Sequence, residues 1–193
     1  MRYALAGQCA LVTGGSSGIG LAIAQLLAEQ GVQVAITSRS AKRATKAAAD
    51  IDAAILQMDR HTASKIAAVE VEAPLAAAAA ATAAFPVLRP ASPPPPSAIL
   101  PVLGLECDVR SSVSVDTVVE AAWVAFGSRL DLVVHAACVS YDALIARASD
   151  ATIEDTLQTN LVGATYLARA VSRKMISKRP IKAAGAAAIA ARG

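Results

Sequence analysis

The segment TGGSSGIG at residues 13–20 decides the fold, because it joins a strand-like run to a helix-like run. The residues that lead into it, CALVT at 9–13, form a short apolar run typical of a buried strand. The residues that follow place apolar side chains on one predicted helical face: Ile19, Ile23, Leu26 and Leu27. Gly31 is positioned to end this helix, and VQVAITS at 32–38 predicts a second strand. This order is a βαβ unit, which predicts a parallel sheet.

The glycines of this segment suit the binding of a diphosphate. Gly14 permits a tight turn, Gly18 lets the backbone approach the phosphates, and Gly20 lets the helix pack close to the strand. The N-terminus of the helix then presents free N–H groups and the positive end of its dipole to the anion. The segment therefore predicts a dinucleotide site at the end of the first strand.

Later segments continue the alternation of helix and strand. Residues 41–51 predict a second helix, VLGLECDV predicts a third strand ending at Asp108, and residues 130–137 predict a fourth strand. Ser111 or Ser112 can cap the helix between the last two strands. The apolar stripe of that helix comprises Val115, Val118, Val119, Ala122, Trp123 and Phe126. A long helix follows, with apolar positions Ile153, Leu157, Leu161, Ala164, Ala168, Val171 and Met175. We expect a doubly wound, Rossmann-like α/β sheet, incomplete at its C-terminus, where AAGAAAIAARG is either a poor fifth strand or a frayed tail.

Between about residues 52 and 98 the helical and strand periodicities fade. Residues 76–81 are six alanines, and eight of the nine prolines lie between Pro74 and Pro101. Proline removes a backbone donor and fixes φ, which favours a loop or a polyproline segment. We interpret this stretch as a disordered low-complexity insertion, with room for a short alanine-rich helix before Pro86. The insertion interrupts a single dinucleotide-binding domain that spans residues 1–193.

Composition excludes several classes of function. A net charge of +3 is too small and too dispersed for a nucleic-acid surface. Cys9, Cys107 and Cys138 show no CxxC spacing and no nearby histidine pair, so we expect reduced thiols and no metal site. Met1–Gly7 lacks the apolar core of a signal peptide, and Ala73–Leu88 is too short to span a membrane. These features predict a cytoplasmic or mitochondrial protein that binds neither nucleic acid nor membrane.

TGGSSGIG resembles the TGxxxGIG pattern of the short-chain dehydrogenase/reductase family at every fixed position. The resemblance covers roughly residues 5–51 and 99–176, and it places HAAC where the family usually has NNAG or NAAG. It implies that Asp108 lies near an adenine and that Asn160 is the asparagine of the catalytic tetrad, which orients a water. The cofactor-binding residues that it implies are Thr13, Gly14, Ser16, Ser17, Gly18, Ile19, Gly20, Arg39, Asp108, Val109, His135, Ala136 and Ala137.

The end of the second strand indicates which form of the cofactor is bound. An enzyme that selects NAD usually places a carboxylate there, which accepts a hydrogen bond from the ribose hydroxyl. This sequence has Arg39 instead, followed by Lys42 and Arg43. Arg39 can pair with a 2′-phosphate through charge-assisted hydrogen bonds. The sequence therefore predicts NADP(H).

Residues 139–164 resemble the 3-oxoacyl-carrier-protein reductases and related carbonyl reductases. The features that carry this likeness are Asp142, Leu144, Ile145 and Arg147. The resemblance implies NADPH-dependent reduction of a ketone, with a 3-oxoacyl thioester or a similar small molecule as substrate. It also implies that the long helix at 153–175 is suited to homo- or hetero-oligomer assembly.

The proton donor of the family is missing from this sequence. The family uses a Ser together with a Tyr whose pKa is lowered by a Lys four residues later. None of the three tyrosines has a lysine at that spacing, and no Ser, Thr or Tyr follows Ser177. Three interpretations stay open: a reductase whose catalytic half is absent from this sequence, a catalytically inactive NADP-binding subunit, and a fragment that does not fold stably.

Overall fold

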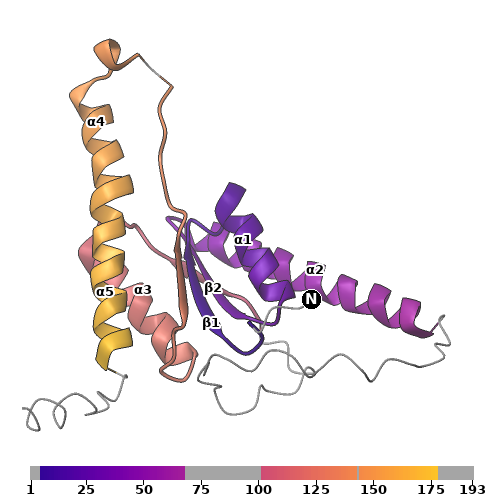
Figure 1. The fold of residues 1–193 in the computed structure, drawn as a ribbon. Helices are drawn as coiled ribbons and strands as arrows, with labels where there is room; N and C mark the ends of the chain where they lie inside the picture. The colour runs from indigo at the N-terminus through magenta and orange to yellow at the C-terminus, as the bar shows by residue number, and fades with distance from the viewer. Residues whose placement is uncertain (1–4, 68–100, 143, 178–193) are drawn as a thin grey trace, which may run out of the picture.

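The structure is a computed structural model that describes residues 5–67, 101–142 and 144–177. Its four strands form one parallel sheet in the order β3-β2-β1-β4. The strands are β1 (Cys9–Thr13), β2 (Gln33–Ser38), β3 (Leu103–Glu106) and β4 (Leu132–His135). The α-helices are α1 (Gly18–Glu29), α2 (Ala41–Ala67), α3 (Ser112–Ala125), α4 (Asp150–Leu157) and α5 (Gly163–Ser177) (Figure 1). The predicted doubly wound α/β fold is confirmed.

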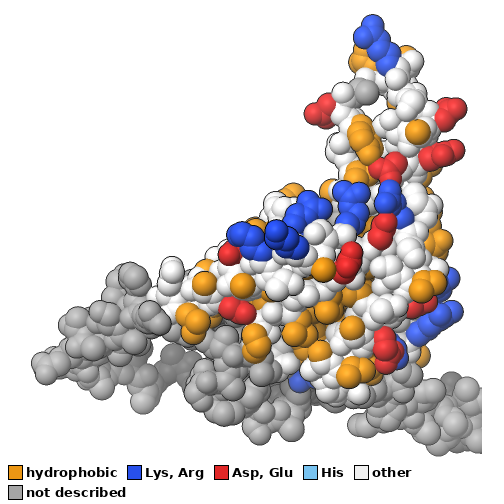
Figure 2. Space-filling model, turned by 180° about the vertical axis from the view of Figure 1, so that it is seen from behind, with side chains coloured by type: hydrophobic (Ala, Val, Ile, Leu, Met, Phe, Trp, Pro, Cys, Tyr) orange, Lys and Arg blue, Asp and Glu red, His pale blue; other side chains and the backbone are white. Residues whose placement is uncertain are grey.

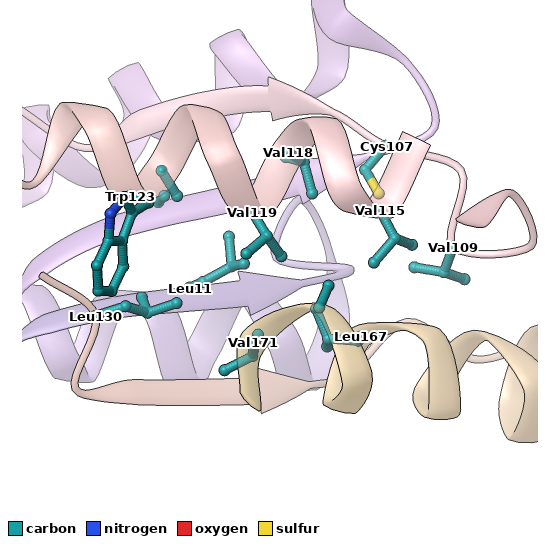
Figure 3. Packing of buried hydrophobic residues seen from close by; sticks show 13 residues of the cluster. Leu11, Cys107, Val109, Val115, Val118, Val119, Trp123, Leu130, Leu167 and Val171 are labelled. Atoms are coloured by element: carbon teal, nitrogen blue, oxygen red, sulfur yellow. The ribbon is translucent and has the colours of Figure 1, made fainter. Parts of the chain in front are cut away.

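Two apolar layers cover the two faces of the sheet, because successive side chains of a strand point to opposite faces. The layer against α1 and α2 contains Val12 and Ile36. The layer against α3 and α5 contains Leu11, and Figure 3 shows it facing Val119 of α3. The predicted stripe on α3 is confirmed, since its buried residues are Val115, Val118, Val119, Ala122 and Trp123.

The helix ends follow the predicted signals. Gly31 stands just after α1 with φ +78, the left-handed conformation that glycine adopts at little cost. Ser111 is the cap of α3, since its side-chain oxygen accepts a hydrogen bond from the backbone N–H of Ser114 at 3.3 Å.

The face of α1 that meets the sheet is not the predicted one. Its buried residues are the small ones, Gly20, Ala24 and Ala28. Ile19 and Leu26 are instead 78% and 60% exposed, and Ile23 and Leu27 are only half-buried. A side chain at position 20 would collide with the carbonyl oxygen of Gly14. The prediction was wrong because a helix that lies this close to the sheet needs small residues rather than large apolar ones.

The second helix is longer than its sequence pattern predicts. α2 continues past Ile51 to Ala67, and Ile55 is buried against the sheet. Asp52 accepts a hydrogen bond from the backbone N–H of Val102 at 3.0 Å, which ties α2 to the start of β3. The predicted start of the insertion at about residue 52 is therefore wrong. The remainder of the predicted insertion, from residue 68, and the predicted tail after 177 lie outside the described residues.

The predicted long C-terminal helix is confirmed in extent but is interrupted by a π-helical turn, Gln158–Val162. A π turn holds an extra residue, so the faces before and after it do not share one helical phase. Ile153, Leu157 and Leu161 are exposed, contrary to the predicted stripe, whereas Val171 is buried as expected. Figure 1 shows α4 projecting beyond the sheet. Within the described ranges, no helix is long and apolar enough to cross a membrane.

Candidate functional site

A cavity of about 570 Å³ lies at the carboxyl ends of the strands. Four segments line it: the glycine loop after β1, the end of β2, the loop after β3 and the segment after β4. The chain passes from β1 to β2 on one side, while β4 lies on the other side of β1. Such a reversal of strand order opens a crevice, and open α/β sheets bind their ligands there.

The glycine loop is shaped by contacts that a larger residue would break. Gly14 has φ +67, and a Cβ on it would lie 2.7 Å from the backbone of Ala137. The N–H of Gly15 donates to the carbonyl of Thr37 at 3.1 Å, which holds the loop against β2. Gly18 has φ +54 and faces open space. Ser17 precedes α1 without a side-chain capping bond, so the first N–H groups of α1 are available to an anion.

Thr13 links the glycine loop to the segment after β4. It is fully buried, and its Oγ1 lies 3.0 Å from Nδ1 of His135. The N–H groups of Ala136 and Ala137 donate to the carbonyl and the hydroxyl oxygen of Thr13. In the described part of the chain, the buried Nε2 of His135 has no hydrogen-bond partner. Burial lowers the pKa of His135, which favours a neutral ring.

Asn160 stands on the π-helical turn and lines the cavity. Its Oδ1 accepts from the N–H of Val139 at 2.9 Å, and its Nδ2 donates to the carbonyl of Val139 at 2.9 Å. Both ends of the amide therefore hold the segment after β4 against the turn. The structure gives Asn160 a positioning contact, and its place in a catalytic tetrad stays a prediction.

Arginine side chains border the cavity at the end of β2 and after β3. Arg39, Arg43 and Arg110 all line it. Figure 2 shows Lys and Arg side chains gathered in a band across one face, with Asp and Glu side chains beside them. An anionic ligand that enters this cavity therefore meets positive charge at its rim.

The structure brings the predicted site residues together. All of them line the cavity except Thr13, which lies buried beneath it. Sequence reasoning gave no site role to Arg110, Cys138 or Val139, which also line it. The sequence does carry a signal for Cys138, because this residue replaces a glycine of the family pattern. The contact of Arg110 with Asp155 leaves no sequence signal, because 45 positions separate the two residues.

A parallel sheet with a glycine loop and an open helix N-terminus at its crevice defines a dinucleotide-binding protein of the Rossmann class. The family model for short chain dehydrogenases matches residues 8–83 and 98–186. The chain thus belongs to the short-chain dehydrogenase family of oxidoreductases.

The chain is also similar to curated proteins and to a solved structure. The chain is 29% identical over 173 residues to 3-oxoacyl-[acyl-carrier-protein] reductase FabG of Escherichia coli, covering 90% of this chain and 51% of that protein. It is 27% identical over 168 residues to carbonyl reductase family member 4 of Danio rerio, covering 87% and 51%. A short chain dehydrogenase from Burkholderia cenocepacia, solved in complex with NADP, has a TM-score of 0.60 at 26% identity, covering 90% and 52%. The chain spans about half the length of these relatives.

Proposed function

We propose that this chain binds NADP(H) in the cavity and is the cofactor-binding part of a short-chain reductase. The substrate of this reductase is a ketone of the 3-oxoacyl thioester class. The observation that carries the proposal is the glycine loop, where Gly14 and Gly20 have no room for a side chain and Gly18 faces open space at the start of α1. This cradle fits a diphosphate. The likeness to FabG supports the substrate class, and the NADP complex of the Burkholderia protein supports the cofactor.

The residues around the cavity have distinct roles in this proposal. The N–H groups at the start of α1 bind the diphosphate, and Arg39 with Arg43 binds the 2′-phosphate. Asp108 accepts a hydrogen bond from the adenine amine. Ala136 and Ala137 form the wall beside the loop, fixed by their bonds to Thr13. NADPH, when bound, supplies the hydride for reduction.

Reduction of a ketone also requires a proton donor next to the carbonyl oxygen. Tyr141 donates its hydroxyl to Asp155 at 2.5 Å, and this hydrogen bond raises the pKa of Tyr141. Tyr166 is a residue of α5 and packs, partly buried, against the apolar core. Of the tyrosines that the structure describes, neither is prepared to act as the acid. This observation favours a second candidate function, a subunit that binds NADP(H) without turnover.

The exposed apolar residues of α4 and the π-helical turn suit contact with another helix. Ile153, Leu157 and Leu161 are 39%, 51% and 61% exposed. We propose that the protein assembles through this side. Light scattering on Leu157→Glu and the unaltered protein tests the proposal: a smaller particle is expected for the variant, and equal sizes contradict assembly through α4.

The cofactor assignment is tested by titrating NADPH and NADH into the protein and into Arg39→Asp. We expect the protein to bind NADPH more tightly, and the variant to lose NADPH affinity and gain NADH affinity. Arg173→Asp is the matched control, because Arg173 is exposed on α5 and does not line the cavity. Equal affinities before and after Arg39→Asp contradict the assignment.

A turnover assay with a 3-oxoacyl thioester and NADPH separates the two candidate functions. Oxidation of NADPH that depends on the thioester supports the reductase. NADPH binding without turnover supports the non-catalytic subunit, and absence of binding contradicts both.

A further inference from the structure

We propose that Arg110 is a positioning residue for the dinucleotide: it fixes the Asp108 carboxylate at the cavity wall and so sets the preference for an adenine base. This inference rests on the proposed function, in which Asp108 accepts from the adenine amine. Arg110 follows β3 and lies in the loop that leads to α3.

Arg110 binds both carboxylate oxygens of Asp108 through two nitrogens of its guanidinium. Its Nε lies 3.0 and 3.2 Å from the two carboxylate oxygens of Asp108, and its Nη2 lies 2.8 Å from Oδ2. The backbone N–H of Arg110 also donates to Oδ1 of Asp108 at 3.1 Å. Planar two-point pairing of this kind fixes the orientation of a carboxylate as well as its position. Asp108 is therefore held in one orientation before any ligand arrives.

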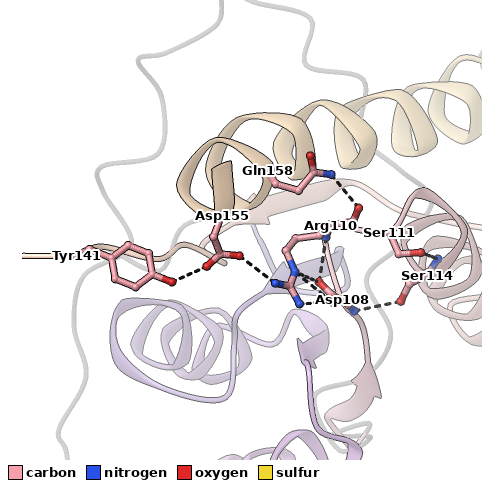
Figure 4. A network of polar contacts seen from close by, with 7 residues as sticks. All are labelled: Asp108, Arg110, Ser111, Ser114, Tyr141, Asp155 and Gln158. Carbon is pink, nitrogen blue, oxygen red and sulfur yellow. Dashed lines mark hydrogen bonds and ion pairs between the residues drawn. The ribbon is translucent and has the colours of Figure 1, made fainter. Parts of the chain in front are cut away.

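A second carboxylate, on α4, also anchors Arg110. Nη1 of Arg110 donates to Oδ1 of Asp155 on α4 at 2.9 Å, and Asp155 accepts from Tyr141 through its other oxygen (Figure 4). Gln158 donates from its side-chain amide to the carbonyl of Arg110 at 3.1 Å. The network joins the loop after β3, the segment after β4 and α4. The guanidinium is therefore held by two carboxylates, and the backbone of Arg110 is held by Gln158.

Asp108 keeps the capacity to bind a base. A carboxylate has about four lone-pair sites, and the three N–H donors of Arg110 leave about one of them for a further donor. The exocyclic amine of adenine is such a donor, whereas hypoxanthine carries a carbonyl oxygen at the same position. A carboxylate fixed in this orientation therefore distinguishes the two bases.

The test compares NADPH with its hypoxanthine analogue, reduced nicotinamide hypoxanthine dinucleotide phosphate, by calorimetric titration. The unaltered protein should prefer NADPH by about tenfold, which corresponds to one hydrogen bond to a charged group. Arg110→Gln should lose most of this preference and Asp155→Asn part of it. Glu120→Gln, which breaks the ion pair with Lys174 outside the cavity, is the matched control and should keep the preference.

Each outcome decides between the inference and the proposed function. If the unaltered protein binds neither dinucleotide, the proposed function fails and the inference fails with it. If it binds NADPH without a preference over the analogue, or if Arg110→Gln keeps the preference, the inference alone is overturned. Thermal unfolding shows whether Arg110→Gln folds. If Arg110→Gln does not fold, the preference for NADPH is measured in Asp155→Asn instead. An undiminished preference in that variant overturns the inference.

Discussion

The two sides of the cavity are built by different forces. On the β1 side, all five residues of β1 are buried, and α1 packs its small residues directly against the sheet. On the β4 side, every residue of β4 is only partly buried and α4 has no buried residue. Polar contacts hold that side instead: Thr13 with His135, Asn160 with Val139, and Tyr141 with Asp155. Apolar packing therefore fixes the diphosphate cradle, and hydrogen bonds fix the opposite wall.

The largest effect is expected where the packed side is broken. Gly20→Ala places a methyl group against the carbonyl of Gly14, which α1 cannot escape without moving off the sheet. We expect a loss of about 3 kcal/mol in the free energy of unfolding, measured with urea. Ala22→Ser, at an exposed position on the same helix, is the control and should change it by less than about 0.5 kcal/mol. Equal stabilities for the two variants would mean that α1 does not pack as described.

The second largest effect is expected when hydrogen bonds on the β4 side of the cavity are removed. Asn160→Ala removes both hydrogen bonds to the backbone of Val139 and leaves that half-buried backbone without these partners. We expect a loss of about 2 kcal/mol in the free energy of unfolding. Asn160→Asp keeps only the acceptor, so its free energy of unfolding should lie between those of the unaltered protein and Asn160→Ala. If Asn160→Ala is as stable as the unaltered protein, hydrogen bonds do not hold this wall.

Two glycines allow an effect on stability to be distinguished from an effect on NADPH binding. Gly18 and Gly127 both have positive φ and open space around them, but only Gly18 lines the cavity. Alanine at either position should cost about 1 kcal/mol of stability, because the left-handed conformation is strained for it. Only Gly18→Ala should also weaken NADPH binding, measured by calorimetry. Equal affinities in the two variants would contradict the role of Gly18 at the diphosphate.

The smallest effect concerns pH and His135. Burial keeps the pKa of His135 below 6.5 in the folded chain, so the unfolded chain binds the proton more readily. The contribution of His135 to stability is complete above about pH 6.5 and declines as the pH falls from there through the folded pKa. His135→Asn should flatten this part of the curve in unfolding experiments at several pH values. Identical pH dependence in both proteins would show that His135 is not held neutral.

The sequence predicted the cradle well because local chemistry defines it. TGGSSGIG combines a strand, a turn that needs glycine and a helix start, and each of these is encoded within a few residues. The sequence did not predict which residues of α1 are buried, because the distance between α1 and the sheet depends on tertiary packing. The residue at which α2 ends was not predicted, because Ile55 is buried by contact with the sheet and the local sequence pattern there is weak.

The polar wall was harder to predict. Its contacts join residues that lie 14 to 122 positions apart, as Tyr141 with Asp155 and Thr13 with His135 do. The π-helical turn that carries Asn160 shifts the helical phase, so the apolar spacing before it did not indicate the buried face. Only the resemblance of TNLVG to a family pattern indicated Asn160.

We infer that the cavity at the carboxyl ends of the strands binds a dinucleotide in this chain alone. Calorimetric titration of NADPH into the 193-residue chain tests it most directly, with thermal unfolding of the same sample to show that the chain is folded. We predict saturable binding of one NADPH per chain. A chain that unfolds cooperatively but takes up no NADPH would contradict the claim.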